Sequence, residues 1–315
     1  MDVDCRGTAA LMLLLVLFNY GASTAHGHDA HWGYEADNGP DTWPELCKTG
    51  TRQSPININP SFVDYANIPK MHFVNYNRSH AVTLKNNGHS VTATGFEKWP
   101  ERPYIYGGGL DGVYELVQFH FHWSALDHQG SEHTLGSLSY PLEAHFVHLK
   151  KGMTLNESLY SDDGLAVVGV FFAQGNDGRP LRPLERSLQD SYAFGGGAEI
   201  HNFLPFEMLP ENHQVFYRYN GSLTTPGCNE AVVWTLLAEP VTVTEVQLNR
   251  LRKHLSTSGR LLTQNYRPVQ PLNGRRVLFR PHNFDLMFAS GGAIYQMSKA
   301  LVGFLSLLLL TASLM

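Results

Sequence analysis

The chain has 315 residues, of which 43% are hydrophobic and 16% charged, and its formal net charge is -5. This composition is rich enough in apolar residues to form a core, and it excludes a highly charged, disordered chain. A sequence pI near 6.3 provides no basic surface for a nucleic-acid backbone, so we expect no nucleic-acid partner.

The first 25 residues have the layout of a secretory signal peptide. An apolar run from Ala9 to Phe18 is followed by several small residues, as such peptides require. The basic region before this run is weak, because Arg6 is offset by Asp2 and Asp4, and a buried core helix is the alternative interpretation. We interpret residues 1–25 as a signal peptide, which directs the protein into the secretory pathway.

Residues 28–286 form one predicted domain, because no repeat, low-complexity segment or linker interrupts them. Short β-rich stretches separated by glycine and proline turns predominate, and they lie at 81–84, 90–94, 114–123, 142–150, 165–173, 214–219, 231–237 and 277–279. The clearest helix is predicted over 243–254, with Thr244 as N-cap and Leu248, Leu251 and Leu255 at helical spacing. The predicted class is mostly β (α+β), a large sheet with short surface helices.

Two cysteines remain in the mature chain, because Cys5 would leave with the signal peptide. In a secreted protein the remaining pair, Cys47 and Cys228, predicts a disulfide, and two free buried thiols are the alternative. Such a link would stabilise the fold by roughly 4 to 5 kcal/mol in a chain-entropy treatment. Three Asn-x-Ser sequons are candidates for glycosylation: Asn77, Asn156 and Asn220.

Residues 287–315 have the order of a glycolipid (GPI) anchor signal. A small-residue stretch at 289–293 precedes a spacer and an uncharged apolar run at 300–315. This run is shorter than the roughly 20 residues of a spanning helix, so we expect removal of the tail and anchoring near Ser290 or Gly291. A short membrane helix that is retained is the alternative. Both interpretations predict a protein on the extracellular face of the plasma membrane.

The strand at 114–123 carries two histidines on one predicted face. Alternation along a strand assigns apolar side chains to one face, namely Val117, Phe119, Phe121 and Trp123. It assigns Leu116, Gln118, His120 and His122 to the other. In the stretch 142–150 the same rule places Glu143, His145 and Val147 on a common face, so a neighbouring strand can present His145 opposite the pair.

Three neutral imidazoles around zinc leave the fourth position open to water, which is the catalytic pattern for this metal. Gln118 and Glu143 each lie two residues before a ligand on the same face, so they are candidate acceptors for the second ring nitrogens. Because the chain has 16 histidines, surface or core roles are the alternative for any one of them. The combination of three ligands and two acceptors favours a zinc site.

The chain closely resembles the α-class carbonic anhydrases, of the extracellular membrane-associated type, over nearly the whole domain. The matching words are HWGY at 31–34, QSPINI at 53–58, NGH at 87–89, the strand at 118–123, GSEHT at 130–134, SLTTP at 222–226 and NYRP at 265–268. The resemblance implies a single domain around a mainly antiparallel, twisted sheet of about ten strands. It also implies Zn2+ at the floor of a conical cleft.

The resemblance further implies reversible hydration of carbon dioxide to bicarbonate and a proton. In this family zinc lowers the pKa of its bound water to near neutrality. The matching positions assign Thr224 and Glu132 to orienting the nucleophile, with the Thr224 N–H holding a substrate oxygen. They assign His89 to carrying the proton away, a task suited to an imidazole.

Other residues match the family's cleft. The resemblance implies a substrate pocket formed by Val147, Val167, Leu223, Thr225, Val232 and Trp234. It implies cleft-lining positions for Tyr34 and Thr92, and it matches Cys47 and Cys228 to the bridging pair of extracellular members. A non-catalytic binding module of the same fold and a zinc esterase are the alternative functions. We interpret His128, His133 and His148 as structural or exposed.

Overall fold

The computed structural model describes residues 32–44 and 46–281. The predicted signal peptide and anchor signal, with Ser290 and Gly291, lie outside these described residues. Within the described ranges, none of the helices combines the length and apolar character that crossing a membrane requires.

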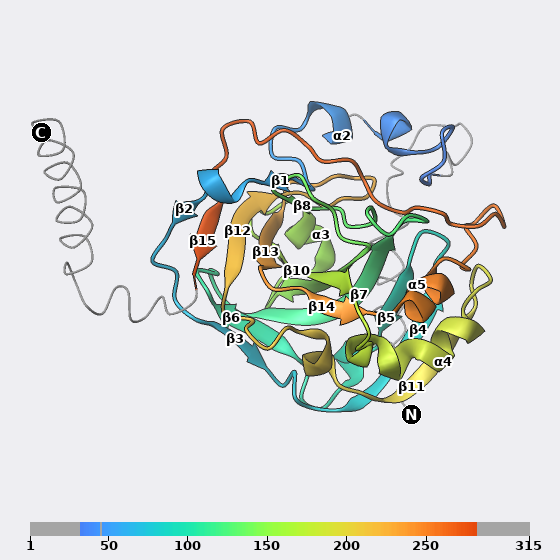
Figure 1. The fold of residues 1–315 in the computed structure, drawn as a ribbon. Coiled ribbons are helices and arrows are strands. Elements are labelled where there is room, and N and C mark those ends of the chain that lie inside the picture. The colour runs from blue at the N-terminus through green and yellow to red at the C-terminus, as the bar shows by residue number, and fades with distance from the viewer. Residues whose placement is uncertain (1–31, 45, 282–315) are drawn as a thin grey trace, which may run out of the picture.

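A 13-stranded sheet runs through the centre of the structure (Figure 1). Its strands are β2 (Asp64–Tyr65), β3 (Met71–Val74), β4 (His80–Asn86), β5 (Val91–Thr94), β6 (Tyr104–Gly107), β7 (Tyr114–Trp123), β9 (Leu142–Lys150), β10 (Leu165–Gln174), β11 (Gly197–Phe203), β12 (Phe216–Gly221), β13 (Val232–Leu237), β14 (Val241–Val243) and β15 (Leu278–Arg280). The main order is β11-β4-β5-β7-β9-β10-β13-β12-β15-β2. The mostly-β prediction is therefore confirmed.

The sheet is mixed, and antiparallel pairs form its majority. Among the described strands nine pairs are antiparallel, whereas β10 pairs with β13 and β14, and β15 with β2, in parallel. A second sheet joins β1 (Asn57–Ile58) and β8 (Thr134–Leu135) in parallel. The sequence prediction lacks the two-residue strands β1, β2 and β8 and the strands β3, β6 and β14, which have only three or four residues. It also lacks β11, most of whose residues are exposed. Such short or exposed segments give too weak a pattern to be recognised as strands.

The helices that the structure describes are short, with seven residues at most. The α-helices are α2 (Leu46–Thr49), α3 (Leu155–Leu159), α4 (Glu185–Asp190) and α5 (Glu245–Leu251), and the 3-10 helices are η2 (Pro40–Thr42), η3 (Pro60–Phe62), η4 (Phe96–Lys98), η5 (Arg179–Leu184) and η6 (Pro205–Met208). Thr244 caps α5 as predicted, because its hydroxyl accepts from the Gln247 N–H and the Gln247 side chain accepts from the Thr244 N–H. The α-helix is shorter than the predicted 243–254.

Strand β7 is buried on both faces, but its alternation is broken by a β-bulge. The pairing with β9 shifts between Leu116 and Gln118, which leaves Val117 as the extra residue. Leu116 consequently packs in the larger core beside Phe119, while Val117 joins the smaller core beside Val147. The predicted faces of Leu116 and Val117 are therefore wrong, whereas the alternation from 118 onward places Phe119, Phe121 and Trp123 together in the larger core.

Candidate metal centre

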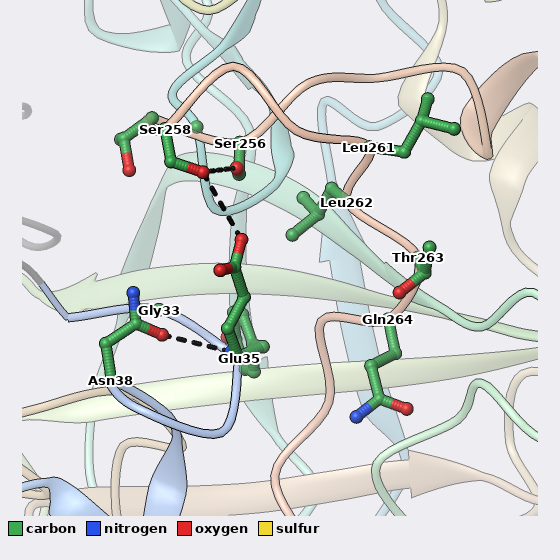
Figure 2. Close-up of a pocket in the computed structure, with 12 residues that line it drawn as sticks. Gly33, Glu35, Asn38, Ser256, Ser258, Leu261, Leu262, Thr263 and Gln264 are labelled. Carbon is green, nitrogen blue, oxygen red and sulfur yellow. Dashed lines mark hydrogen bonds between the residues drawn. The ribbon is translucent and has the colours of Figure 1, made fainter.

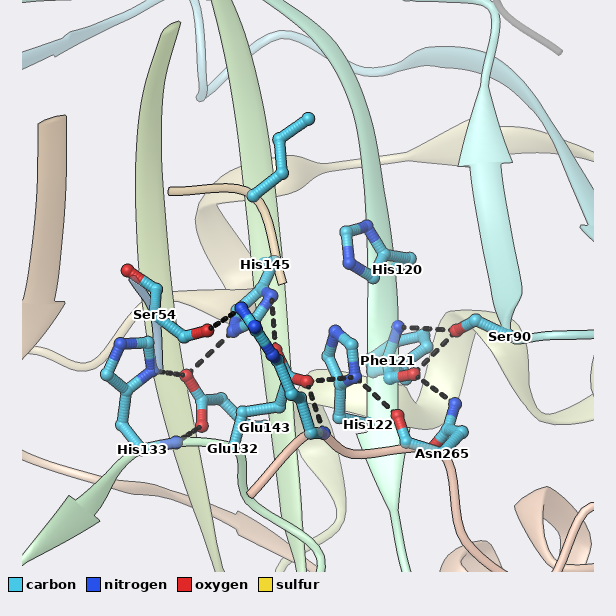
Figure 3. A network of polar contacts seen from close by, with 12 residues as sticks. Ser54, Ser90, His120, Phe121, His122, Glu132, His133, Glu143, His145 and Asn265 are labelled. Atoms are coloured by element: carbon cyan, nitrogen blue, oxygen red, sulfur yellow. Dashed lines mark hydrogen bonds and ion pairs between the residues drawn. The ribbon is translucent and has the colours of Figure 1, made fainter. Parts of the chain in front are cut away.

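His120, His122 and His145 meet where β7 and β9 run side by side (Figure 3). The antiparallel register pairs His120 directly with His145. The ring centroid of His145 lies 5.2 Å from that of His120 and 4.5 Å from that of His122. All three side chains are buried, and one nitrogen from each lies within 4.8 Å of the others. Adjacent strands therefore bring the three predicted ligands together.

Each of the three rings has one nitrogen held by an acceptor. The Gln118 Oε1 lies 2.9 Å from His120 Nδ1, and the Glu143 Oε1 lies 2.7 Å from His145 Nε2. The main-chain carbonyl of Asn265 accepts from His122 Nδ1 at 2.7 Å. These contacts assign the opposite nitrogens, Nε2 of His120 and His122 and Nδ1 of His145, to the common centre.

These opposite nitrogens fit a zinc ion. In the described part of the chain His122 Nε2 is buried and has no hydrogen-bond partner, which is costly unless another group such as a metal satisfies it. Burial lowers the pKa of all three imidazoles, most strongly for His120 and His122, so they are neutral donors at pH 7. Three neutral histidines with a fourth direction open form the donor set of catalytic zinc.

Glu143 connects the ligand His145 to a buried polar chain. Its Oε1 also lies 2.8 Å from His133 Nδ1, and its Oε2 accepts from the His133 N–H at 2.9 Å. His133 Nε2 contacts the Tyr219 hydroxyl at 2.6 Å, and that hydroxyl donates to Ser54 Oγ. Burial alone would raise the pKa of Glu143, but the two histidines outweigh it and hold this pKa below its usual range. Glu143 is therefore an anionic acceptor.

Glu132 is a second buried carboxylate close to the ligands, and its contacts differ from those of Glu143. Its Oε1 is 3.5 Å from His122 Nδ1 and accepts from the Arg267 N–H at 2.8 Å. Burial raises the pKa of Glu132 well above its usual range, and the nearby Thr224 hydroxyl and the Arg267 N–H oppose this rise. A divalent cation nearby would favour the carboxylate further. Thr224 thus lies close enough to Glu132 to influence the pKa of its carboxyl group.

The part of the chain that contains these residues matches a known protein family. The family model of the eukaryotic-type carbonic anhydrases matches residues 38–281. The chain belongs to this family. It is 45% identical to "Putative carbonic anhydrase 5" of Caenorhabditis elegans over 95% of this chain and 97% of that protein. It is 40% identical to human carbonic anhydrase 7 over 80% of this chain and 97% of the relative.

Most of the expected carbonic anhydrase pocket lines one cavity beside the ligands. The lining residues are Gln118, His120, His145, Val147, Val167, Leu223, Thr224, Thr225 and Trp234. Val232 is fully buried in the smaller core and is not part of this lining. The cavity is therefore lined both by apolar side chains and by two metal ligands with Thr224, which suits a small uncharged substrate.

His89 lies in the turn that precedes β5. Its ring stacks on that of Trp32 with centroids 3.7 Å apart and an interplanar angle of 7°. Thr92, on β5, pairs in register with His120. Tyr34 is buried and its ring packs against those of Trp32 and Trp43. None of these three predicted residues lines the cavity described above, and Tyr34 lines a second cavity.

A second cavity is lined by residues around Glu35, by Gly88 and by residues between 256 and 264 (Figure 2). Its polar lining is already engaged, because the Glu35 carboxylate pairs with Arg260 and accepts from Ser258, while the Glu35 N–H donates to Asn38. The two metal-suitable clusters of the described residues both lie elsewhere. We therefore assign the metal centre to the histidine cavity.

The predicted disulfide between Cys47 and Cys228 is confirmed. It joins residues 181 positions apart with Cα atoms separated by 5.1 Å. Cys228 follows Thr224 by four residues, and the Arg267 side chain donates to the Cys47 carbonyl at 2.6 Å. The link therefore holds the Thr224 loop against the N-terminal part of the domain. The asparagines of the three sequons are all exposed: Asn77, Asn156 and Asn220.

Sequence reasoning missed one member of the metal centre. Asn265 lies in the recognised NYRP word, yet its role rests on a main-chain carbonyl. Every residue type has a main-chain carbonyl, so the identity of residue 265 does not indicate this contact. The third orienting contact could be found only once the segment after α5 was placed against β7.

Proposed function

We propose that this member of the family is an active zinc enzyme that catalyses the reversible hydration of carbon dioxide to bicarbonate and a proton. The observation that carries the proposal is the convergence of nitrogens from three buried, neutral histidines beside a cavity that is lined by two of these histidines, Thr224 and apolar side chains. His120, His122 and His145 would hold the zinc. Gln118, Glu143 and the Asn265 carbonyl would orient their rings.

Zinc bound there would supply a water molecule of lowered pKa, and hence a nucleophile at neutral pH. Thr224, which lies near Glu132, would donate a hydrogen bond from its hydroxyl group to that carboxylate. Its oxygen would then be left to accept a hydrogen bond from the nucleophile. This arrangement would restrict the nucleophile's orientation before reaction, which is a large source of rate enhancement. Val147, Val167 and Trp234 would seat the uncharged substrate.

Release of the product proton requires an acceptor that titrates near neutral pH. An imidazole is suited to this transfer, and His89 lies on the turn next to β5, whose Thr92 pairs with His120. We therefore assign proton export to His89. The stacked Trp32 ring would define one orientation of its imidazole.

Parallel assays of carbon dioxide hydration and ester hydrolysis on the purified protein test this function. We expect bound zinc and rapid hydration, with ester cleavage as a slower side reaction. Ester cleavage without hydration would favour the zinc esterase, and a folded protein without zinc or activity would favour the binding module.

We also propose that the enzyme acts at the extracellular face of the plasma membrane, held by a GPI anchor. The Cys47–Cys228 disulfide supports an oxidising compartment, and the exposed sequon asparagines are accessible for glycosylation. The uncharged run at 300–315 supports the anchor. Phosphatidylinositol-specific phospholipase C should release the protein from intact cells. Retention after digestion that releases a known anchored protein would favour a membrane helix instead.

A further inference from the structure

The side chain of Asn265 joins the ligand strand to the turn that holds His89. It is fully buried. Its Oδ1 accepts from the Trp123 N–H at 2.7 Å, while its Nδ2 donates to the carbonyls of Phe121 at 2.9 Å and His89 at 3.0 Å. The partners determine the orientation of the amide, because the carbonyls accept only from its NH2 end and the N–H donates only to its oxygen. Figure 3 shows Asn265 beside Phe121 and His122.

The His89 turn lies beyond the strand pairing that organises the metal ligands. Pairing of β5 with β7 involves Thr92, Ala93 and Thr94. Within the turn, the Asn87 Oδ1 accepts from the N–H groups of His89 and Ser90. These bonds shape the turn locally but do not connect it to β7. The contact of Asn265 with the His89 carbonyl makes that connection, and the Ser90 hydroxyl adds another by donating to the Phe121 carbonyl.

Asn265 acts on the two functional histidines through different atoms. Its main-chain carbonyl accepts from His122 Nδ1, whereas its side-chain amide holds the carbonyl of His89. A side-chain substitution therefore preserves the group that orients the ligand and removes the group that holds the turn. The two effects can be separated by mutation.

We infer that the Asn265 side chain is a positioning residue for proton transfer, which sets the place of His89 relative to the metal ligands. This inference rests on the proposed function. Transfer rates fall steeply when a reacting group moves, and a displacement of about 1 Å can reduce a rate by about 100-fold. Loss of the amide should therefore slow proton export while leaving the hydration step and zinc binding largely intact.

A double-mutant cycle on the full chain tests the inference. Under the proposed function kcat at low buffer concentration reports proton export, and kcat/KM reports hydration. We expect Asn265→Ala to lower kcat by about ten-fold in the wild-type background, and by less than about two-fold when His89→Ala is already present. kcat should fall more than kcat/KM or the zinc content, and added imidazole buffer should restore kcat.

Equal losses of kcat in both backgrounds, or a parallel loss of zinc and kcat/KM, would overturn the inference and indicate a general structural role. Wild-type protein without hydration activity would instead refute the proposed function. Asn229→Ala is the matched control, because it removes an amide bond to the Leu159 carbonyl on α3. Its effect on kcat should not depend on His89.

If Asn265→Ala folds poorly, a second variant and a measurement that does not depend on catalysis still test the inference. Asn265→Asp retains the acceptor for the Trp123 N–H but loses the amide donors to the carbonyls. Hydrogen–deuterium exchange of its metal-free form should be faster than wild type in residues 87–90 and unchanged at Trp123. Unchanged exchange in 87–90 would contradict the inference.

Discussion

The metal ligands and the proton-handling residues are held in two different ways. His120, His122 and His145 lie on β7 and β9, which pair along almost their whole lengths. Thr224 and His89 lie in loops. The Thr224 loop is linked to Cys47 by a disulfide spanning 181 positions, and the His89 carbonyl is bonded to Asn265, 176 positions away.

This difference suggests that metal binding and proton handling are separable. A strand ladder places ligands through bonds that repeat at every residue, so one lost side chain leaves the others in position. A loop depends on a few distant contacts, and loss of one of them changes the position of the loop. We therefore expect variants in β7 and β9 to affect zinc, and variants in the loops to affect turnover with zinc retained.

The largest effect is expected for His145→Ala. Removing one of three protein ligands should eliminate zinc and reduce hydration to the uncatalysed rate, because two histidines do not form the donor set of catalytic zinc. Metal analysis and stopped-flow hydration measure both quantities. His201→Ala, at an exposed position of β11, is the control and should resemble wild type. A zinc-replete, active His145→Ala protein would refute the ligand assignment.

Thr224→Ala tests the prediction that variants in the loops affect turnover while zinc is retained. Loss of the hydroxyl that orients the nucleophile should lower kcat/KM by about 100-fold, and the zinc content should remain at one per chain. The exposed Thr263 provides the control variant Thr263→Ala, which should be fully active. Concurrent loss of zinc would show that the loop and the ligand strands are not separable.

Gln118→Ala tests the orienting contacts within the ladder. His120 would lose the acceptor at 2.9 Å, and loss of such partners typically weakens metal affinity by about 10- to 100-fold. Competition with a chelator of known affinity measures the change. An unchanged zinc affinity would mean that strand pairing alone orients His120.

The smallest effect concerns acid stability of the metal-free protein. Burial lowers the pKa of His148 on β9 to about 3, whereas an unfolded histidine titrates near 6.5. Between these values the unfolded chain binds the extra proton, so the free energy of unfolding should fall as the pH falls below 6.5. At pH 5, protonation of this histidine in the unfolded chain should lower the free energy of unfolding by about 2 kcal/mol.

Urea unfolding at pH 7 and pH 5 measures this loss. His148→Asn, which lacks the titrating ring, should show a loss smaller by about 2 kcal/mol. Equal losses in wild type and His148→Asn would show that His148 does not contribute to the acid sensitivity of the ligand strands.

Sequence predicted the ligand strands and the Cys47–Cys228 disulfide well, but it missed contacts between distant segments that involve main-chain atoms. The bounds predicted for β7 and β9 agree with the structure, because long runs of alternating residues determine both the strand and its faces. The bulge at Val117 arises from pairing with β9 and has no separate signature in β7. The Asn265 carbonyl and the Arg267 N–H likewise act through main-chain atoms, so only the assembled fold reveals their roles.

Titration of zinc into the metal-free full chain, with hydration measured at each step, tests the central claim most directly. We predict that activity rises in proportion to bound zinc and saturates at one ion per chain. His145→Ala should show no such rise. A folded wild-type chain that binds one zinc yet does not accelerate hydration would contradict the account.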